Sequence, residues 1–128
     1  MRWKGQKAKA WEAVRAYIKL RDGDNCFTCM NSGPDFSYDT GHCWPVAIVG
    51  SNNTLSWDER QIARQCKRCN GPGQGMQEAF IRKLTQKYGA KTVAELRGRV
   101  YRVDPIKDWG QIIDHFTKLR DTVETRQA

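Results

Sequence analysis

The 128-residue sequence predicts one small α+β domain that is mostly helical and carries a single β-hairpin. Three observations support this fold class. Amphipathic periodicity indicates helices near both ends of the chain. A short run rich in β-branched and aromatic residues indicates strands between them. Two cysteine pairs, each with two residues between its members, bracket that central region. The whole chain, 1–128, is therefore interpreted as one domain.

The first expected element is an amphipathic helix over about 7–21. Trp11, Val14 and Ile18 recur on one face, and lysines and arginines occupy much of the rest. The turn sequence "DGDN" (22–25) ends this helix. Residues 36–49, "FSYDTGHCWPVAIV", predict strands, and "GSNN" (50–53) predicts a hairpin turn.

The second half of the chain is predicted to be helical again. The loop "NGPGQG" (70–75) leads into a helix over about 76–88, and Gly89 suits its C-terminus. The apolar stripe of this helix consists of Met76, Phe80, Leu84 and Tyr88. Thr92 and Glu95 match a capping box that starts a short helix. The last helix covers about 107–124, so the C-terminal helices together span about 92–124. The apolar stripe of the last helix either closes the core or forms an interface between two copies. This stripe consists of Trp109, Ile112, Ile113, Phe116, Leu119 and Val123.

Positive charge is concentrated in the first hundred residues. The formal charge is +8, and residues 1–103 carry 18 Lys and Arg against 9 Asp and Glu, whereas residues 104–128 carry 4 against 5. A basic surface attracts polyanions, of which nucleic acid is the commonest, although it can also serve solubility alone. No stretch reaches the roughly 20 apolar residues of a membrane span, and the N-terminus has no apolar signal segment. We therefore expect a cytoplasmic protein.

The cysteine pairs indicate a structural zinc site. Cys26 and Cys29 form one CxxC and Cys66 and Cys69 form another, with 36 residues between the pairs. Four thiolates at tetrahedral corners are a common structural site for Zn²⁺, and such a closed site leaves no position for catalysis. An iron–sulfur cluster remains possible from the ligand type alone, whereas a thioredoxin-like site would need a βαβ pattern that is missing.

The stretch "DTGHCWP" (39–45) lies inside the loop that the cysteine pairs close. Neighbouring strand residues point to opposite faces, so we expect Cys43 to fill the core and to be unconnected with the chemistry of His42. His42 itself is either a general base or a structural histidine bonded to backbone. His115, on the last amphipathic helix, is expected to have a surface or packing role.

The order CxxC, then "GH" on a strand, then CxxC followed at once by Asn, resembles the zinc-braced HNH (His-Me finger) nucleases. Within them it is most similar to the NinG/Rap recombination endonucleases of lambdoid phages. "AYIKLRDGDNCFTC" (16–29) resembles that family's helix and first knuckle, and "WDERQIARQCKRCN" (57–70) its second knuckle. "QEAFIRKLTQKYGAKTVAEL" (77–96) and "IIDHFTKLRDTV" (112–123) resemble the helices that follow.

The resemblance implies a ββα-metal core over about 26–88, braced by zinc and flanked by N- and C-terminal helices. It implies that His42 is the general base and that Asn70 is the helix-side ligand of a catalytic Mg²⁺ or Mn²⁺. Asp39 is the candidate strand-side ligand, because the usual acidic position before the histidine holds Gly41. Gln61 stands at the middle position of the motif, which is usually Asn, and is the candidate catalytic residue that would orient the His42 imidazole by a hydrogen bond; the alternative is a helix-surface residue.

The implied substrate is branched or duplex DNA, including recombination intermediates such as D-loops and Holliday junctions. Basic residues near the motif are the expected phosphate contacts, namely Arg60, Arg64, Lys67, Arg68, Arg82 and Lys83. Phosphate contacts carry no sequence information, which suits selection by DNA shape. Symmetric cleavage of a four-way junction would need a homodimer. Two alternatives stay open: a non-catalytic, zinc-braced DNA-binding or recruitment module, and an RNA-binding zinc protein.

Overall fold

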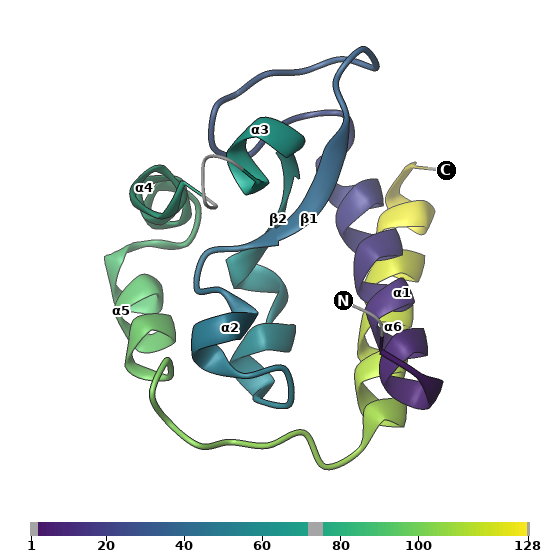
Figure 1. Ribbon diagram of the computed structural model, residues 1–128. Helices are drawn as coiled ribbons and strands as arrows, with labels where there is room; N and C mark the ends of the chain where they lie inside the picture. Colours follow the sequence, from purple (N-terminus) through teal and green to yellow (C-terminus); the bar gives the residue numbers. More distant parts are fainter. Residues whose placement is uncertain (1–2, 72–75, 128) are drawn as a thin grey trace.

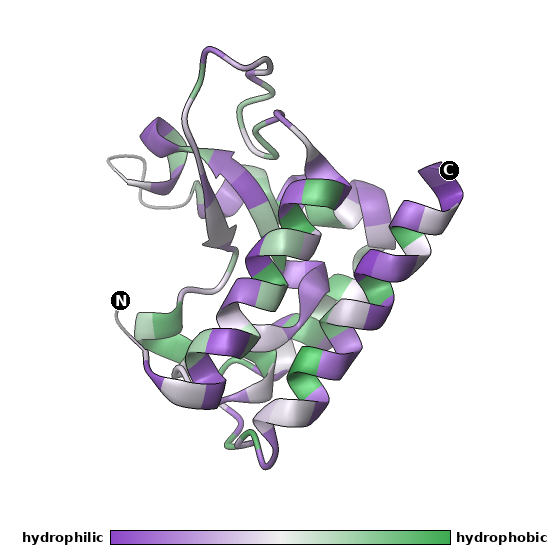
Figure 2. Cartoon of the chain, turned by 90° about the vertical axis from the view of Figure 1, so that its right-hand side faces the viewer, coloured by the Kyte–Doolittle hydropathy of each residue, from purple (hydrophilic) through white to green (hydrophobic). Residues whose placement is uncertain are grey.

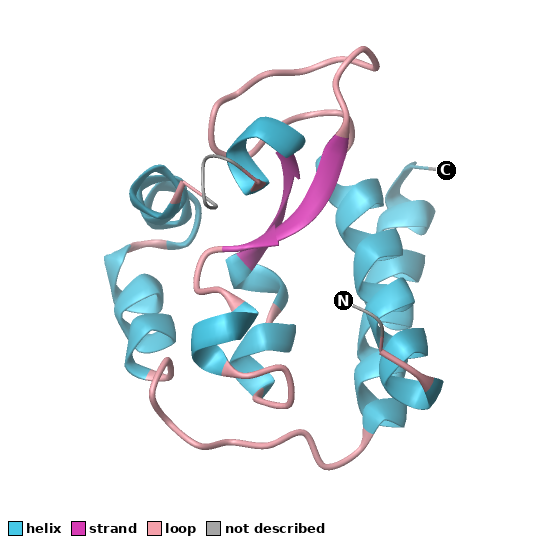
Figure 3. Cartoon of the chain, viewed as in Figure 1, coloured by secondary structure: helices cyan, strands magenta, loops and turns pink. Residues whose placement is uncertain are grey.

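The structure is a computed structural model that describes residues 3–71 and 76–127 (Figure 1). Its elements, in chain order, are α1 (Gly5–Asp22), β1 (Tyr38–His42), α2 (Val46–Val49), the 3₁₀ turns η1 (Thr54–Trp57) and η2 (Glu59–Gln61), β2 (Ile62–Cys66), α3 (Lys67–Asn70), α4 (Gln77–Tyr88), α5 (Ala90–Gly98) and α6 (Trp109–Gln127). Within the described residues the chain is mostly helical around one two-stranded sheet (Figure 3), which confirms the predicted α+β class.

Helices α1 and α6 lie side by side along one flank of the molecule (Figure 1). Hydrophilic residues alternate with hydrophobic ones along both helices (Figure 2), as expected where one face is buried and the other meets water. A first hydrophobic core lies between these two helices and contains the predicted apolar stripe of α1. Val14 and Ile18 are fully buried in it, and Trp11 packs against them. Phe116 is fully buried there too, and the rest of the α6 stripe packs around it. The stripe of α6 therefore closes the core.

The sheet pairs two segments that are far apart in the sequence. β1 runs antiparallel to β2, with His42 opposite Ile62 and Asp39 opposite Gln65. The expectation of strands throughout residues 36–49 and a hairpin turn at 50–53 is wrong, because β1 ends at His42, residues 46–49 form α2, and the next strand begins only at Ile62. Pro45 is the N-cap of this short helix, with φ −70°, and a proline has no N–H to donate to a strand partner. The true partner of β1 comes after both 3₁₀ turns.

A second core lies between the sheet and helices α4 and α5. Phe80 and Leu84 of α4 are buried in it, as the predicted stripe requires. Met76 precedes the helix in a left-handed conformation and is 40 % exposed, so the buried stripe begins one turn later than predicted. Gly89, with φ 92°, ends α4 as expected.

Gly89 is also the residue from which α5 begins. The predicted capping box at Thr92 is therefore wrong, because Thr92 already lies in the first turn of that helix. A single glycine with positive φ turns the chain sharply enough to start the next helix at once, so no side-chain cap is needed.

The predicted loop "NGPGQG" lies partly outside the described residues, at 72–75. Across the two described ranges, no helix combines the length and the apolar character needed to cross a membrane.

Candidate functional site

The four predicted zinc ligands converge on one point. The sulfur atoms of Cys26, Cys29, Cys66 and Cys69 all lie within 4.8 Å of one another. The Cys29 and Cys66 sulfurs are 3.7 Å apart, whereas a disulfide would bring them to about 2.05 Å. Tetrahedral thiolates with Zn–S distances of about 2.3 Å have sulfurs about 3.8 Å apart. The donor set and its spacing therefore fit a structural zinc ion.

This cysteine cluster ties the segment after α1 to the sheet. The first knuckle is a tight turn in which the Cys26 N–H donates to the Asn31 carbonyl at 2.7 Å and the Cys29 N–H points at the Cys26 sulfur at 3.5 Å. Burial raises the pKa of Cys26, but hydrogen bonds from the Thr28 hydroxyl and from backbone N–H groups outweigh it and lower the pKa to about 6. Cys26 thus favours the thiolate that a metal needs, whereas burial raises the pKa of Cys29 and raises that of Cys69 to about 12.

His42, the last residue of β1, is held from two sides. Its Nε2 lies 2.8 Å from the carbonyl oxygen of Ser56, and the Trp11 indole stacks on the imidazole with ring centroids 5.6 Å apart and planes 11° apart. A carbonyl oxygen only accepts, so Nε2 carries the proton and Nδ1 keeps its lone pair. Burial lowers the pKa of His42, with the Ser56 bond opposing it. At neutral pH the ring is therefore uncharged and can accept a proton at Nδ1.

Gln61 does not orient the imidazole directly, which corrects the role that the resemblance gave it. Its side chain is fully buried; its Oε1 accepts from the Trp44 N–H at 2.9 Å, and its Nε2 donates to the Leu55 carbonyl at 2.8 Å. Leu55 is adjacent to Ser56, whose carbonyl holds His42. Gln61 thus acts through the backbone, by fixing the turn that supplies the orienting carbonyl.

Asp39 and Asn70 are brought together across β1 and α3. The Asn70 Nδ2 donates to Asp39 Oδ2 at 3.3 Å, and the Lys67 ammonium lies 2.6 Å from Asp39 Oδ1. Carboxylate and amide oxygens are the donors that Mg²⁺ and Mn²⁺ take, and Lys67 already pairs with the Asp39 carboxylate. The hydrogen bond and ring contact of His42 come from η1 and α1 instead. Strand alternation therefore places the imidazole on the other face of β1 from Asp39.

Gly41 comes two residues after Asp39 and therefore shares its face of β1. It has no room for a side chain on that face. A Cβ added to it would overlap Gln65 Oε1 and would lie 2.7 Å from Asn70 Oδ1. The space that a side chain at this position would fill is thus taken by two amide oxygens. The Gln65 and Asn70 amide oxygens lie on the same face of β1 as the Asp39 carboxylate. Oxygen donors of this kind fit a divalent cation.

The family model described as "Bacteriophage Lambda NinG protein" matches residues 2–124. The chain belongs to the NinG family. Protein ninG of Enterobacteria phage H19B is 33 % identical over 90 residues, which are 69 % of this chain and 42 % of that protein. The chain therefore spans less than half the length of the curated relative it matches. No solved structure matches the chain.

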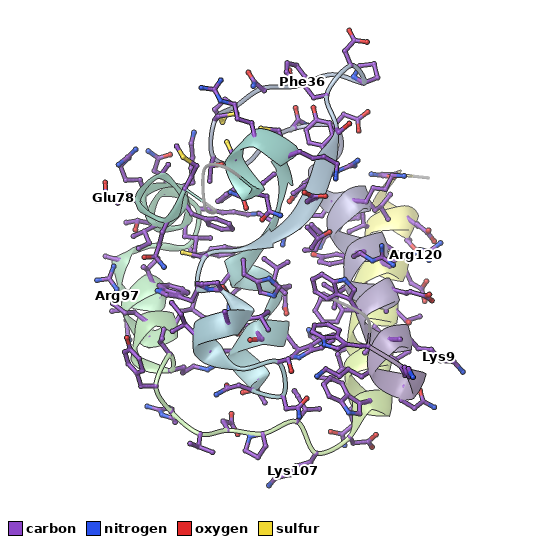
Figure 4. The ribbon with its side chains drawn as sticks, in the orientation of Figure 1. Lys9, Phe36, Glu78, Arg97, Lys107 and Arg120 are labelled. Carbon is purple, nitrogen blue, oxygen red and sulfur yellow. The ribbon has the colours of Figure 1, made fainter. Side chains whose placement is uncertain are left out.

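The basic residues of this NinG-family chain differ in how they are engaged. Arg60 is paired with Asp58 at 2.9 Å, and Arg64 with Asp24 at 3.4 Å while it lies over the Tyr38 ring. Lys67 is paired with Asp39, and Lys83 donates to the Met30 sulfur at 3.1 Å. Arg68 and Arg82 are exposed, on α3 and α4. Figure 4 shows Arg120 on α6, on the opposite side of the molecule from α4.

The remaining predicted side chains lie as expected. Cys43 is 2 % exposed in the second core, and burial raises its pKa to about 12, so it is an unreactive core residue. His115 is exposed, its Nε2 lies 3.1 Å from Glu59 Oε2, and its ring meets Phe116 edge to face.

Sequence reasoning missed the residues that support the site. Ser56 acts through its backbone carbonyl, which leaves no trace in the residue type. Trp11 was placed on an apolar helix face, but nothing in its spacing points to His42. Thr28 and Gln65 are buried polar residues that lie inside the first CxxC and directly before the second. A polar side chain at each of these two positions is the one sequence signal that could have drawn attention to them.

Proposed function

We propose that this NinG-family chain is a divalent-metal-dependent DNA endonuclease of the HNH type, acting on branched recombination intermediates with His42 as general base. One observation carries the proposal. The five-residue strand β1 bears both a histidine fixed as a proton acceptor and a carboxylate joined to the amide of Asn70.

Hydrolysis of a phosphodiester needs a base for the attacking water and positive charge near the phosphate. His42 supplies the base, because Ser56 holds the proton on Nε2 and leaves Nδ1 to take one from water. Asp39 and Asn70 would hold a Mg²⁺ or Mn²⁺ ion, which supplies electrostatic stabilisation of the developing charge. The proposal requires the scissile phosphate to cross the end of β1, where the imidazole lies on one face and the oxygens on the other.

The structural zinc site serves this arrangement without taking part in it. Cys66 ends β2, Cys69 lies in α3, and both are bound to the loop after α1 through the cluster. The metal-side residues Asp39 and Asn70 therefore sit on elements that the cysteine cluster holds in place.

The charge distribution supports DNA as the substrate. The excess of lysine and arginine lies in residues 1–103, which include the sheet, α3 and α4. Contacts to phosphate alone favour recognition by shape, which suits D-loops and four-way junctions. Symmetric resolution of a junction would need two copies of the chain, since each carries one such site.

Cleavage assays test the proposal directly. Supercoiled plasmid, linear duplex and four-way junctions are incubated with the zinc-loaded chain and Mg²⁺ or Mn²⁺. We expect cleavage by the unaltered chain, loss of about 10²–10⁴-fold in rate for His42→Ala because the general base is gone, and unchanged cleavage for the matched variant His115→Ala. Wild-type rates from His42→Ala would refute the mechanism.

A zinc-braced DNA-binding module is the second candidate. The enclosure of His42 between Trp11 and the Ser56 carbonyl is the observation that favours it, since a purely structural histidine would be held in the same way. Salt-sensitive DNA binding with no cleavage under Mg²⁺ or Mn²⁺ would assign this function instead, and a preference for RNA would assign an RNA-binding protein.

A further inference from the structure

Gln65 lies directly opposite Asp39 in the antiparallel ladder, on the face of the sheet that α3 covers. Directly opposed residues have Cβ atoms about 4.5–5.5 Å apart and project to the same face. The Gln65 side chain is fully buried, and its amide donates a hydrogen bond to the Thr28 hydroxyl oxygen inside the fold. β1, β2 and α3 thus each send one oxygen-bearing side chain to the same place: Asp39, Gln65 and Asn70.

The Gln65 amide oxygen fills the position that a side chain on residue 41 would take. A Cβ at Gly41 would overlap Gln65 Oε1 and lie 2.7 Å from Asn70 Oδ1. Two amide oxygens therefore converge beside a glycine, on the face that carries the Asp39 carboxylate. Convergence of three hard oxygens from three elements is an arrangement that suits a divalent cation.

The orientation of the Gln65 amide follows from the zinc knuckle. Gln65 Nε2 donates to the Thr28 hydroxyl oxygen at 3.1 Å, and that oxygen lies 3.5 Å from the Cys26 sulfur. A zinc-bound thiolate only accepts hydrogen bonds, so the Thr28 hydroxyl donates to the sulfur and accepts from Gln65. The amide nitrogen is thereby held toward Thr28, and the oxygen is directed toward Gly41 and Asn70.

We propose that Gln65 is an oxygen ligand of the divalent ion, taking the place of the carboxylate missing at Gly41, and that Thr28 positions it from the structural zinc site. The inference rests on the divalent site of the proposed function but names a ligand and a positioning residue that neither the motif nor the family resemblance supplies. Outer-shell partners of this kind hold metal ligands in orientation.

The test measures Mn²⁺ binding by the full zinc-loaded chain, using calorimetry and the electron paramagnetic resonance signal of free Mn²⁺, with no DNA present. Gln65→Met keeps the length of the side chain and removes the oxygen. We expect it to weaken Mn²⁺ binding by about 10- to 100-fold while zinc content stays at one equivalent.

Thr28→Val removes the hydroxyl and keeps the shape of the side chain. We expect it to weaken Mn²⁺ binding by about 10-fold, and Thr28→Ser to restore it, because serine keeps the hydroxyl. A merely structural role for Thr28 would change the thermal midpoint of both variants without separating their Mn²⁺ affinities. Lys67→Ala is a further comparison, and should tighten Mn²⁺ binding because the ammonium no longer competes for Asp39.

The outcomes separate this inference from the proposed function. If Gln65→Met and Thr28→Val bind Mn²⁺ as tightly as the unaltered chain, while Asp39→Ala and Asn70→Ala bind it weakly, the role of Gln65 is wrong and the endonuclease proposal stands. If Asp39→Ala and Asn70→Ala also leave Mn²⁺ binding unchanged, the divalent site itself is wrong and both proposals fail with it.

Discussion

Ser56 and Trp11, both distant from His42 in the sequence, hold its side chain in place. The Ser56 carbonyl accepts a hydrogen bond from His42 Nε2 at 2.8 Å, and Trp11 of α1 stacks on the imidazole. The first contact determines which nitrogen carries the proton, and the second shields the ring from water. Both favour the neutral imidazole, which is the form that can act as a base.

The pH dependence of cleavage follows from this enclosure. Burial lowers the pKa of His42 below its usual 6.5, so the ring stays neutral until the pH falls below that value. We expect the acid limb of the cleavage rate to lie below pH 6.5, with the rate falling as the pH drops through the pKa of His42. Rates measured from pH 5 to 8 with saturating Mn²⁺ check this.

Trp11→Ala should move that acid limb to higher pH. Removal of the indole exposes the imidazole to water, which eases its protonation and returns the pKa toward 6.5. His115→Ala, which alters an exposed histidine elsewhere, should leave the limb in place. An acid limb that is the same in Trp11→Ala as in the unaltered chain would show that a different group titrates.

Gln61→Ala is expected to destabilise the fold. Its amide satisfies the Trp44 N–H and the Leu55 carbonyl inside the core, and both would lose their partner. The loss should be about 3 kcal/mol, since each buried polar group left unpaired costs about 1–3 kcal/mol. Urea unfolding of the zinc-loaded chain measures it. Gln86→Ala, at an exposed position on α4, is the matched control, and an equal loss in both variants would contradict the role of Gln61.

Cys26→Ser should abolish zinc binding, whereas Cys43→Ala should keep one equivalent. Zinc stabilises the native chain by about 4 kcal/mol when its concentration is a thousand times the dissociation constant, so the serine variant loses a stabilisation of that size. Elemental analysis and thermal unfolding with and without a zinc chelator measure both effects. Less than half an equivalent of zinc in the unaltered chain, or a coloured iron–sulfur cluster, would overturn the zinc assignment.

DNA binding should depend on the exposed arginines near the site. Arg68→Ala and Arg82→Ala should each reduce the slope of log affinity against log salt by about 1, because each removes one phosphate contact. Arg120 is paired with Glu124 on α6, on the other side of the molecule, and Arg120→Ala should leave the slope unchanged. Binding is measured by fluorescence anisotropy with a labelled duplex and no added Mg²⁺ or Mn²⁺. Equal slopes in all three variants would place the DNA on another surface.

Local patterns in the sequence predicted the elements that depend on local physics. The stripe of α1, the buried face of α4 and the whole apolar face of α6 could be read from their spacing, because a helix repeats every 3.6 residues whatever it packs against. The two CxxC pairs could likewise be recognised together as one zinc site, and the structure shows that all four sulfurs meet.

The sequence could not identify the partner of β1. Strand pairing is decided by register between distant segments and by which face is buried, and neither appears in a local pattern. The sequence therefore predicted strand over residues 46–49 with a hairpin turn directly after it, whereas Pro45 starts α2 there and the partner of β1 begins at Ile62.

For the candidate site too, some features could be predicted from the sequence and others required the tertiary structure. The sequence by itself determined which chemical groups are present: the four thiols, the histidine, and the carboxylate and amide on either side of the second strand. Only the tertiary structure decided what each group touches. In the structure the Gln61 side chain bonds to backbone groups and not to His42, and the Ser56 carbonyl orients the imidazole. Gln65 lies opposite Asp39, with its amide oxygen next to Gly41. The contacts of His42 with Ser56, of Gln61 with Trp44 and of Gln65 with Asp39 join residues 14 to 26 positions apart, and only packing brings such segments together.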